Sequence, residues 1–227
     1  MDAQRVTAPT VPVRWWSDGG FEAAWAASAT FTTSAASAVS GADELRIVGV
    51  RGQGERKAAR RAIRGALAAA LAEVTGVPVA GIRVGGLPGE APFASVSCGL
   101  RGERRVGVAI SHDGELSVAA FRLDGGPVGI DVMQVIDVPD WEPVARDYLG
   151  PGCAAALGHV PAAARADAFA RAWSEREAML KCLGMPLAEW DPAETDRLGT
   201  CTCRAIALPA GYVGTVATAT PTGTVTG

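Results

Sequence analysis

Three side chains in the C-terminal third of the chain combine types that could act on a phosphate group. Trp173, Glu177 and Lys181 lie in the segment Phe169–Gly184, FARAWSEREAMLKCLG. If this segment is helical, the four-residue spacing puts all three on one face. The glutamate precedes the lysine, which is the order that favours an ion pair between residues i and i+4. Two interpretations follow: a solvated face with one modest salt bridge, or a carboxylate and an ammonium held together to bind a metal and a phosphate.

A second candidate is an aspartate inside an apolar segment. In the sequence PVGIDVMQV, the apolar Val128, Ile130 and Val132 would point to one side of a strand. Asp131 would point to the other side. A carboxylate in the middle of an apolar strand is costly unless it is paired or binds a metal. Asp131 is therefore a candidate metal ligand.

A histidine follows Ser111 at a predicted hairpin turn. His112 begins the turn signal HDG. A single turn histidine is usually structural or exposed, and its spacing alone does not decide its role.

The elements that would position these residues alternate between strands and helices. Ile63, Leu67, Leu71 and Val74 recur at helical spacing in the segment 54–77, and Gly76 and Pro78 end that helix. Two further helices are expected around 140–149 and 161–184. Strands are predicted at 11–17, 44–51, within 82–98, at 104–111, 115–122 and 126–135, and in the terminal segment 201–220. Because turn signals join the strands 104–111, 115–122 and 126–135, we expect these three to form a meander. The mixture predicts an α+β fold.

Length and composition limit the class of protein. The chain has 227 residues, of which 48% are hydrophobic and 20% charged, enough for one large domain or two half-size ones. The net charge of −3 gives no general reason to expect nucleic-acid binding. No N-terminal stretch has the layout of a signal peptide, and the apolar run 65–77 is too short to span a bilayer. We expect no membrane contact and a cytoplasmic, reducing location.

The five cysteines do not form a secreted disulfide framework. Their number is odd, and their spacing has no such pattern. Cys201 and Cys203 lack a second pair that would complete a metal site, so strand alternation explains them better.

Three motifs, in this order and at this spacing, resemble those of the surfactin-type 4′-phosphopantetheinyl transferases. They are AISHDG around His112, GPVGIDV around Asp131 and the segment that carries Glu177. The family shows Ser-His near a hairpin, then V-G-[IV]-D-[IV]-E, then W-[ST]-x-K-E-[AS]-x-x-K-x-x-G. The third motif is matched at Trp173, Ser174, Glu177, Ala178, Lys181 and Gly184. The resemblance covers residues from about 45 to 205.

The resemblance implies a reaction and a set of residue roles. The family moves the phosphopantetheine arm of coenzyme A to a serine hydroxyl of a carrier protein and releases adenosine 3′,5′-bisphosphate. Asp131 and Glu177 would bind Mg²⁺, and Glu177 could also help to take the serine proton. Lys181 would contact the pyrophosphate. His112 would contact the 3′-phosphate of coenzyme A, and Arg61 falls where relatives have a coenzyme A-binding arginine.

Arg61 belongs to a basic stripe on the predicted helix. With Lys57, Arg60 and Arg64 it would lie opposite the apolar face. A solvated face and a binding surface for coenzyme A both remain open as interpretations of this stripe.

The sequence departs from the family pattern at four places. Met133 stands where the family has a glutamate, and a thioether is a poor Mg²⁺ ligand, so water is expected there. Arg176 replaces a lysine and keeps the charge with a different geometry. The segment Gly89–Pro92, GEAP, replaces Gly-Lys-Pro and loses a base at Glu90, and Ala109 replaces a frequent asparagine.

The resemblance also implies an architecture. Surfactin-type transferases are monomers of two similar α/β halves, like a fused pair of holo-acyl-carrier-protein synthase subunits. We expect halves at residues 1–125 and 126–227, the second carrying the metal site. The carriers could be fatty-acid, polyketide or peptide-synthetase domains. The alternative hypothesis is a degenerate relative that binds coenzyme A or carrier proteins without turnover; it rests on Met133 and Glu90.

Overall fold

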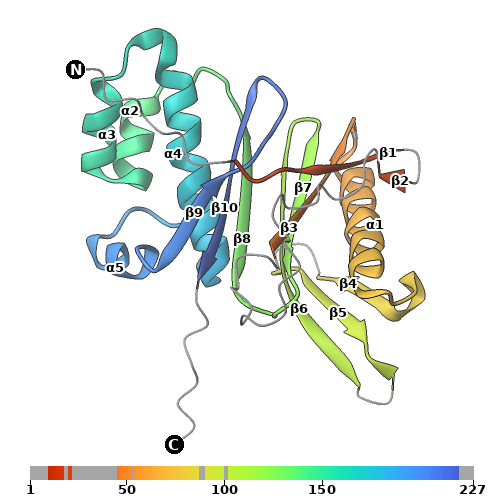
Figure 1. Cartoon of the computed structure of the whole chain (residues 1–227). Coiled ribbons are helices and arrows are strands. Elements are labelled where there is room, and N and C mark those ends of the chain that lie inside the picture. Colours follow the sequence, from red (N-terminus) through yellow and green to blue (C-terminus); the bar gives the residue numbers. More distant parts are fainter. Residues whose placement is uncertain are drawn as a thin grey trace, which may run out of the picture.

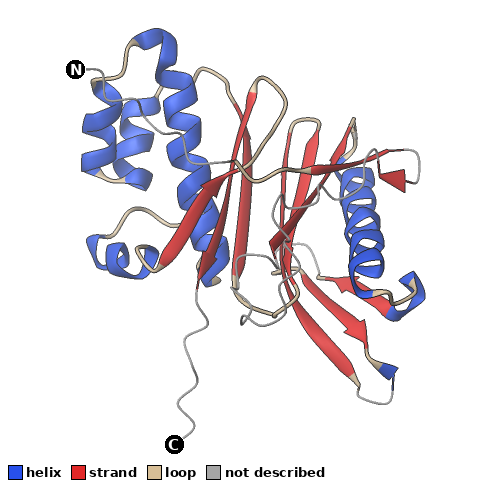
Figure 2. Cartoon of the chain, in the orientation of Figure 1, coloured by secondary structure: helices blue, strands red, loops and turns tan. Residues whose placement is uncertain are grey.

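Two β-sheets pack face to face between two long helices. The computed structural model describes residues 10–17, 20–21, 45–52, 54–86, 90–99 and 102–219. Helix α1 (Arg56–Thr75) covers the outer face of the first sheet, and α4 (Ala162–Leu183) covers that of the second (Figure 1). Figure 2 shows the strands in the centre with helices on both sides. This α+β arrangement agrees with the predicted fold class.

The first sheet has seven strands in the order β2-β1-β3-β7-β6-β5-β4. Its central strands are antiparallel, and only β1 runs parallel to its neighbour β3. The strands are β1 (Arg14–Ser17), β2 (Gly20–Phe21), β3 (Leu45–Arg51), β4 (Ile82–Gly85), β5 (Phe93–Ser97), β6 (Glu103–Asp113) and β7 (Leu116–Arg122).

The second sheet has the antiparallel order β8-β10-β9. Its strands are β8 (Val128–Gln134), β9 (Cys201–Ala205) and β10 (Tyr212–Ala219). The predicted meander was therefore wrong in its third strand, because β8 pairs with β10 and not with β7. Both edges of β7 are already occupied by β3 and β6, so β8 has no free edge to join there.

The helical segments largely follow the sequence patterns. Ile63, Leu67 and Leu71 are fully buried under the first sheet, and Val74 packs at the edge of the same cluster, as the helical spacing predicted. The predicted helix around 140–149 is a short α2 (Trp141–Val144) continued by a π-helical turn (Ala145–Leu149). Helix α3 (Pro151–Gly158) was not predicted, although Pro151 at its first position is a start signal. Further short elements in the described part of the chain are 3₁₀ turns at Val79–Gly81 and Pro192–Glu194 and helix α5 (Thr195–Leu198).

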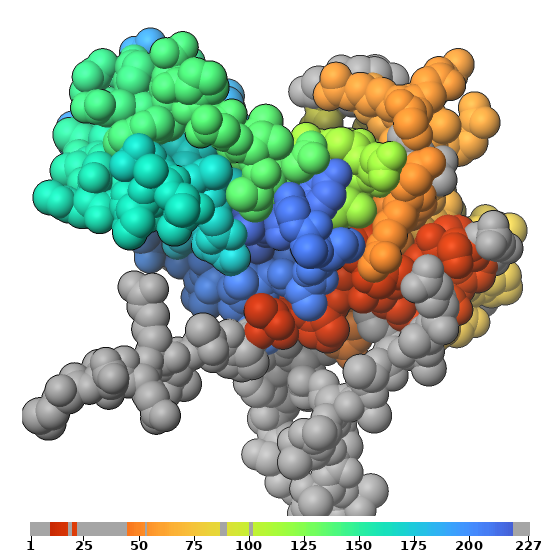
Figure 3. Space-filling view, turned by 90° about the horizontal axis from the view of Figure 1, so that it is seen from above, coloured from red at the N-terminus to blue at the C-terminus, as the bar shows by residue number. Residues whose placement is uncertain are grey.

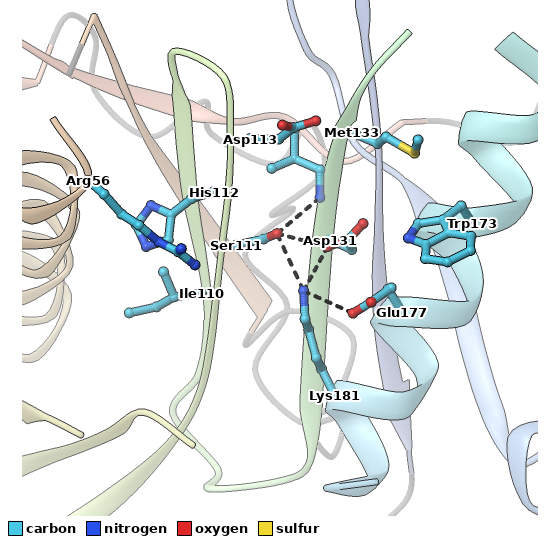
Figure 4. A pocket seen from close by; sticks show the side chains of 11 residues that line it. Arg56, Ile110, Ser111, His112, Asp113, Asp131, Met133, Trp173, Glu177 and Lys181 are labelled. Carbon is cyan, nitrogen blue, oxygen red and sulfur yellow. Dashed lines mark hydrogen bonds and ion pairs between the residues drawn. The ribbon is translucent and has the colours of Figure 1, made fainter. Parts of the chain in front are cut away.

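Helix α4 lies unusually close to β8. A Cβ atom at Gly129 would come within 1.9 Å of the carbonyl oxygen of Ala178 and 2.5 Å of the amide nitrogen of Cys182. Gly129 is therefore required for this approach, and the same face of β8 carries Asp131 and Met133 toward α4 (Figure 4). The opposite face, with Val128, Ile130 and Val132, packs in the core between the sheets, as predicted.

With β4, β5 and the shorter helices set aside, the two sides of the central core share an order of elements. One side has β3, α1, β6 and β7, with β7 between β3 and β6. The other has β8, α4, β9 and β10, with β10 between β8 and β9. In each set, the strand that comes last in the sequence lies between the other two strands in the sheet. Near the N-terminus, the backbone of Val11 exchanges hydrogen bonds with Ala205 and Ala207, which ties residue 11 to the second sheet.

A few residues named from the sequence are not covered. Glu44 at the start of a predicted strand, Gly89 of the segment GEAP and position 220 of the terminal strand lie outside the described residues. Among the described residues, no helix is both long enough and apolar enough to cross a membrane.

Candidate active site

Asp131 is the centre of a small polar network. Asp131 is buried, with only 6% of the residue exposed, yet Oδ1 accepts hydrogen bonds from Lys181 Nζ at 2.7 Å and from Ser111 Oγ at 2.8 Å. Lys181 Nζ also lies 3.5 Å from Glu177 Oε2 and 3.4 Å from Ser111 Oγ. The ammonium therefore bridges the two carboxylates that the sequence singled out, one from β8 and one from α4 (Figure 4). The ion pair between Glu177 and Lys181 exists, and it is part of a larger cluster.

Strand β6 holds the outer edge of β8 in place through two side chains. Because β8 is the edge strand of its sheet, this edge has no neighbouring strand to pair with. Ser111 Oγ accepts a hydrogen bond from the amide of Val132 at 3.3 Å, and Asp113 Oδ2 accepts one from the amide of Gln134 at 2.6 Å. These contacts satisfy edge amides and bring the end of β6 beside Asp131.

Helix α4 is fixed to β8 by one further hydrogen bond. Ser174 is fully buried, and its Oγ donates to the main-chain oxygen of Asp131 at 3.2 Å. Because Trp173 directly precedes Ser174 and Glu177 and Lys181 lie on the next two turns of α4, this hydrogen bond fixes the position of all three along β8.

Burial and charge oppose one another at Asp131. Burial raises the pKa of this carboxyl and is the dominant cause; the ammonium of Lys181 and the hydroxyl of Ser111 lower the pKa, and the charge of Glu177 raises it. Two carboxylates share one ammonium, so the cluster has a surplus negative charge. Hard oxygen ligands with surplus negative charge suit a divalent cation.

An open cavity of about 420 Å³ lies beside this network. It is formed by β6, β8, α4 and the start of α1 (Figure 4). Its lining residues are Arg56, Ile110, Ser111, His112, Asp113, Asp131, Val132, Met133, Trp173, Glu177 and Lys181. Figure 3 shows the β6–β7 region, coloured yellow-green, at the surface between residues coloured orange, which include α1, and the green-to-cyan lobe that includes α2–α4.

His112 lies near the turn between β6 and β7, as predicted, and it lines the same cavity. Its Nδ1 lies 2.8 Å from Ser117 Oγ. Burial, followed by the positive charges of Arg60, Arg56, Lys181 and Arg64, lowers the pKa of His112 to about 4. The ring is therefore neutral at neutral pH, in a strongly positive surrounding.

The basic stripe of α1 divides into two faces. Arg56, Arg60 and Arg64 are spaced by four residues, so they lie on one face of the helix. Their positive charges lower the pKa of His112, and Arg56 lines the cavity. Lys57 and Arg61 lie one position further round the helix and are exposed to solvent. Arg61 was a candidate ligand for coenzyme A, but it is not among the residues that line the cavity.

The departures from the motifs have different consequences. Met133 lines the cavity beside Trp173, so this replacement affects the site directly. Arg176 is 95% buried on another side of α4, where it pairs with Glu194 at 3.2 Å. Ala109 is buried between the two sheets, and Glu90 is exposed.

A comparison with known families bears on the second half of the chain. Residues 127–214 match the family model of the 4′-phosphopantetheinyl transferase superfamily. The matched span contains Asp131, Glu177 and Lys181, whereas Ser111 and His112 are contributed by β6 from outside it. No curated protein matches the chain.

Some residues of the site were missed by sequence reasoning. Arg56 had a signal, because it stands four residues before Arg60 on the polar side of a predicted helix. Asp113 had none, since an aspartate in the turn HDG is ordinary. Within the described residues, no group of three or more histidine, cysteine or acidic side chains could hold a metal ion, so Cys201 and Cys203 take part in no such cluster.

Proposed function

We propose that this protein transfers the 4′-phosphopantetheine arm of coenzyme A to a serine hydroxyl of a carrier protein and releases adenosine 3′,5′-bisphosphate. The observation that carries the proposal is the meeting of Asp131, Glu177, Lys181 and His112 at one cavity, although they come from three separate elements. The family match over residues 127–214 supports it.

We propose that Asp131 and Glu177 hold Mg²⁺. The donor set fits this ion, because Mg²⁺ is typically bound through one or two carboxylates, with water and substrate phosphates as its other ligands. Both carboxylates lie within 3.5 Å of the Lys181 ammonium, which already occupies a cation position between them. When bound, the ion would neutralise charge on the pyrophosphate.

The protein's own residues would position the reactants. In this reaction the serine oxygen of the carrier forms a bond to the phosphorus next to pantetheine, and the bond from that phosphorus to the adenosine-bisphosphate oxygen breaks. Lys181 would contact the pyrophosphate and balance the negative charge on the leaving group. Glu177 would also accept the serine proton. His112 would contact the 3′-phosphate.

Arginines of α1 would complete the phosphoadenosine end. We prefer Arg56 and Arg60 to Arg61 for this role, because Arg56 lines the cavity and both act electrostatically on His112. Arg61 is exposed on a neighbouring face of the helix and would contact the phosphate only from the solvent side.

We further propose that the chain is a surfactin-type monomer made of two related halves, residues 1–125 and 126–227. The repeated order of strand, helix and two strands, with the last strand in the middle of each sheet, supports this. A cytoplasmic location accords with coenzyme A and carrier proteins as partners.

Mass spectrometry of an apo carrier protein tests the function. The carrier is incubated with the protein, coenzyme A and Mg²⁺, and a gain of one phosphopantetheine mass is expected. Panels of fatty-acid, polyketide and peptide-synthetase carriers would identify the substrate class. If the protein binds coenzyme A or a carrier but no carrier in any panel gains mass, the result would instead support the alternative of a degenerate relative without transferase activity.

A further inference from the structure

A buried serine lies directly opposite the cavity histidine. Ser117 on β7 and His112 on β6 are partners in the antiparallel register, so their side chains lie on the same face of the sheet. Ser117 is 2% exposed, and its Oγ lies 2.8 Å from Nδ1 of the ring. The β6–β7 hairpin therefore fixes this contact, whatever is bound in the cavity.

The contact leaves the other ring nitrogen as the polar atom available to a ligand. A neutral imidazole has one N–H and one lone pair, and the hydrogen bond at one nitrogen decides which nitrogen carries the proton. If the Ser117 hydroxyl donates to Nδ1, the proton resides on Nε2. If the hydroxyl accepts from Nδ1, the lone pair resides on Nε2.

The surroundings of His112 favour an anionic ligand. The positive charges of three arginines of α1, at positions 56, 60 and 64, and of Lys181 of α4 are close enough to lower the pKa of the ring. An oxyanion drawn in by these charges would be repelled by a lone pair on Nε2 and stabilised by an N–H there. The hydroxyl of Ser117 can provide the donor that this tautomer needs at Nδ1.

We propose that Ser117 is a positioning residue whose hydroxyl donates to Nδ1 of His112 and keeps the ring proton on Nε2, where it is offered to the 3′-phosphate of coenzyme A. The ligand assignment rests on the proposed function; the tautomer does not. Strand β7 reads LSVAAFR and is buried throughout, so the serine is a polar residue in an apolar strand. An unpartnered hydroxyl there would cost stability, and His112 is the partner that satisfies it.

Nitrogen-detected NMR of the imidazole groups tests the tautomer without any substrate. The chain has two histidines, and exposed His159 serves as an internal reference. At pH 7 we expect an Nε2–H tautomer for His112 in the wild type and a mixture of tautomers in Ser117→Ala, with His159 unchanged. A wild-type ring protonated on Nδ1, or an unchanged pattern in Ser117→Ala, would overturn the proposal. Neither result depends on transfer activity.

Kinetics with two donors test the ligand. Dephospho-coenzyme A lacks the 3′-phosphate, so Ser117→Ala should raise KM for coenzyme A about three- to tenfold and leave both kcat and the KM for dephospho-coenzyme A unchanged. Ser117→Thr, which keeps the hydroxyl, should restore most of the affinity. Combining Ser117→Ala with His112→Ala should add nothing to His112→Ala alone.

A matched control removes a buried hydroxyl elsewhere. Ser95 on β5 is 6% exposed and bonds to Glu103, so Ser95→Ala should leave KM for both donors unchanged. Equal penalties on the two donors in Ser117→Ala, or additive losses in the double variant, would mean that the serine does not act through the histidine on the 3′-phosphate. Absence of any transfer by the wild type would overturn the proposed function and leave the NMR result standing.

Discussion

Burial disfavours the charged form of the Asp131 carboxyl. Its pKa is raised by burial although Lys181 and Ser111 both stabilise the charged form. Keeping a charge at such a position costs stability, and carboxyls with a pKa perturbed in this way are often found at functional sites. The proposed use is to hold Mg²⁺ together with Glu177.

The first prediction separates activity from stability at these carboxylates. Losing an outer partner of a metal ligand typically costs about 10–100-fold, so losing a direct ligand should cost about a hundredfold or more. We expect this loss of transfer for Asp131→Asn and for Glu177→Gln in the mass-spectrometric assay. The melting temperature of Asp131→Asn should be unchanged or higher, because the amide keeps the contact with Ser111 and removes a buried charge.

Matched controls lie close by. Glu175 is exposed on the same helix and lines a different cavity, and Asp137 is exposed just after β8. Glu175→Gln and Asp137→Asn should leave transfer unchanged. Near-normal transfer by Asp131→Asn at limiting Mg²⁺ would contradict the assigned metal site.

The second prediction concerns Met133, which lines the cavity on the same face of β8 as Asp131. Met133→Glu adds a carboxylate where water is expected to complete the ligand set, so the Mg²⁺ concentration for half-maximal transfer should fall severalfold. Met133→Gln has the same length without the charge and should cause no such fall. An equal response of the two variants would mean that residue 133 does not reach the ion.

The third prediction follows from the lowered pKa of His112. Between pH 6.5 and about 4 the histidine binds a proton in the unfolded chain but not in the folded protein. The His112 contribution therefore lowers the free energy of unfolding as pH falls through this window. Urea unfolding at pH 7 and pH 4.5 should show a smaller acid-induced loss for His112→Gln than for the wild type. The exposed-site variant His159→Gln should keep the wild-type loss.

At the scale of elements, the contact between α4 and β8 determines where the carboxylates meet. The fourth prediction is that Gly129→Ala disrupts this contact, because its Cβ would lie 1.9 Å from the Ala178 oxygen and the clash is with backbone. Urea unfolding should show a loss of about 1–3 kcal/mol or more, and transfer should fall because Glu177 and Lys181 move away from Asp131. Gly65→Ala is the matched control: it has open space in the interior of α1 and should stabilise by about 0.5–1 kcal/mol. Equal stabilities of the two variants would contradict the close approach.

Sequence periodicity predicted the elements better than their pairing. The alternation around Asp131 gave the correct faces of β8, and the spacing of Ile63, Leu67 and Leu71 gave the correct face of α1. Such patterns record burial on one face of a single element. Strand pairing depends on which strand edges are already occupied. Nothing in the turn sequence LDGG, residues 123–126 between β7 and β8, shows that β3 and β6 occupy both edges of β7.

The same limit explains what was missed at the site. The structure brings Asp131, Glu177, Lys181 and His112, which the three motifs named, to one cavity. The arginine at the cavity is Arg56 and not Arg61, because the angle at which α1 packs on the sheet selects between adjacent helix faces. Ser117 had no sequence signal, since its contact with His112 depends on the register between β6 and β7.

At the scale of the whole molecule, the core between the sheets joins the two sides of the protein. Ile47 of β3 and Val118 of β7 meet Ile130 of β8 and Val216 of β10, and all four are at most 1% exposed. Ser111 of the first sheet and Lys181 of α4 both contact Asp131, so the candidate active site also joins the two sides. Neither sheet can therefore bury its inner face without the other.

The last prediction is that the described fold unfolds as one unit, although it contains two sheets. Ile47→Ala on the first sheet and Ile130→Ala on the second each remove fully buried side-chain volume from the shared core. Each should lower the free energy of unfolding by about 2–5 kcal/mol in urea. Because either loss weakens both sheets, calorimetry should still give a single transition with equal calorimetric and van't Hoff enthalpies. Ile136→Ala, the same change at a side chain that is 52% exposed, should stay within about 0.5 kcal/mol of the wild type. Two transitions, with only one shifted by Ile47→Ala, would instead show that residues 1–125 and 126–227 fold independently, and the active site would then depend on the docking of two separately stable halves.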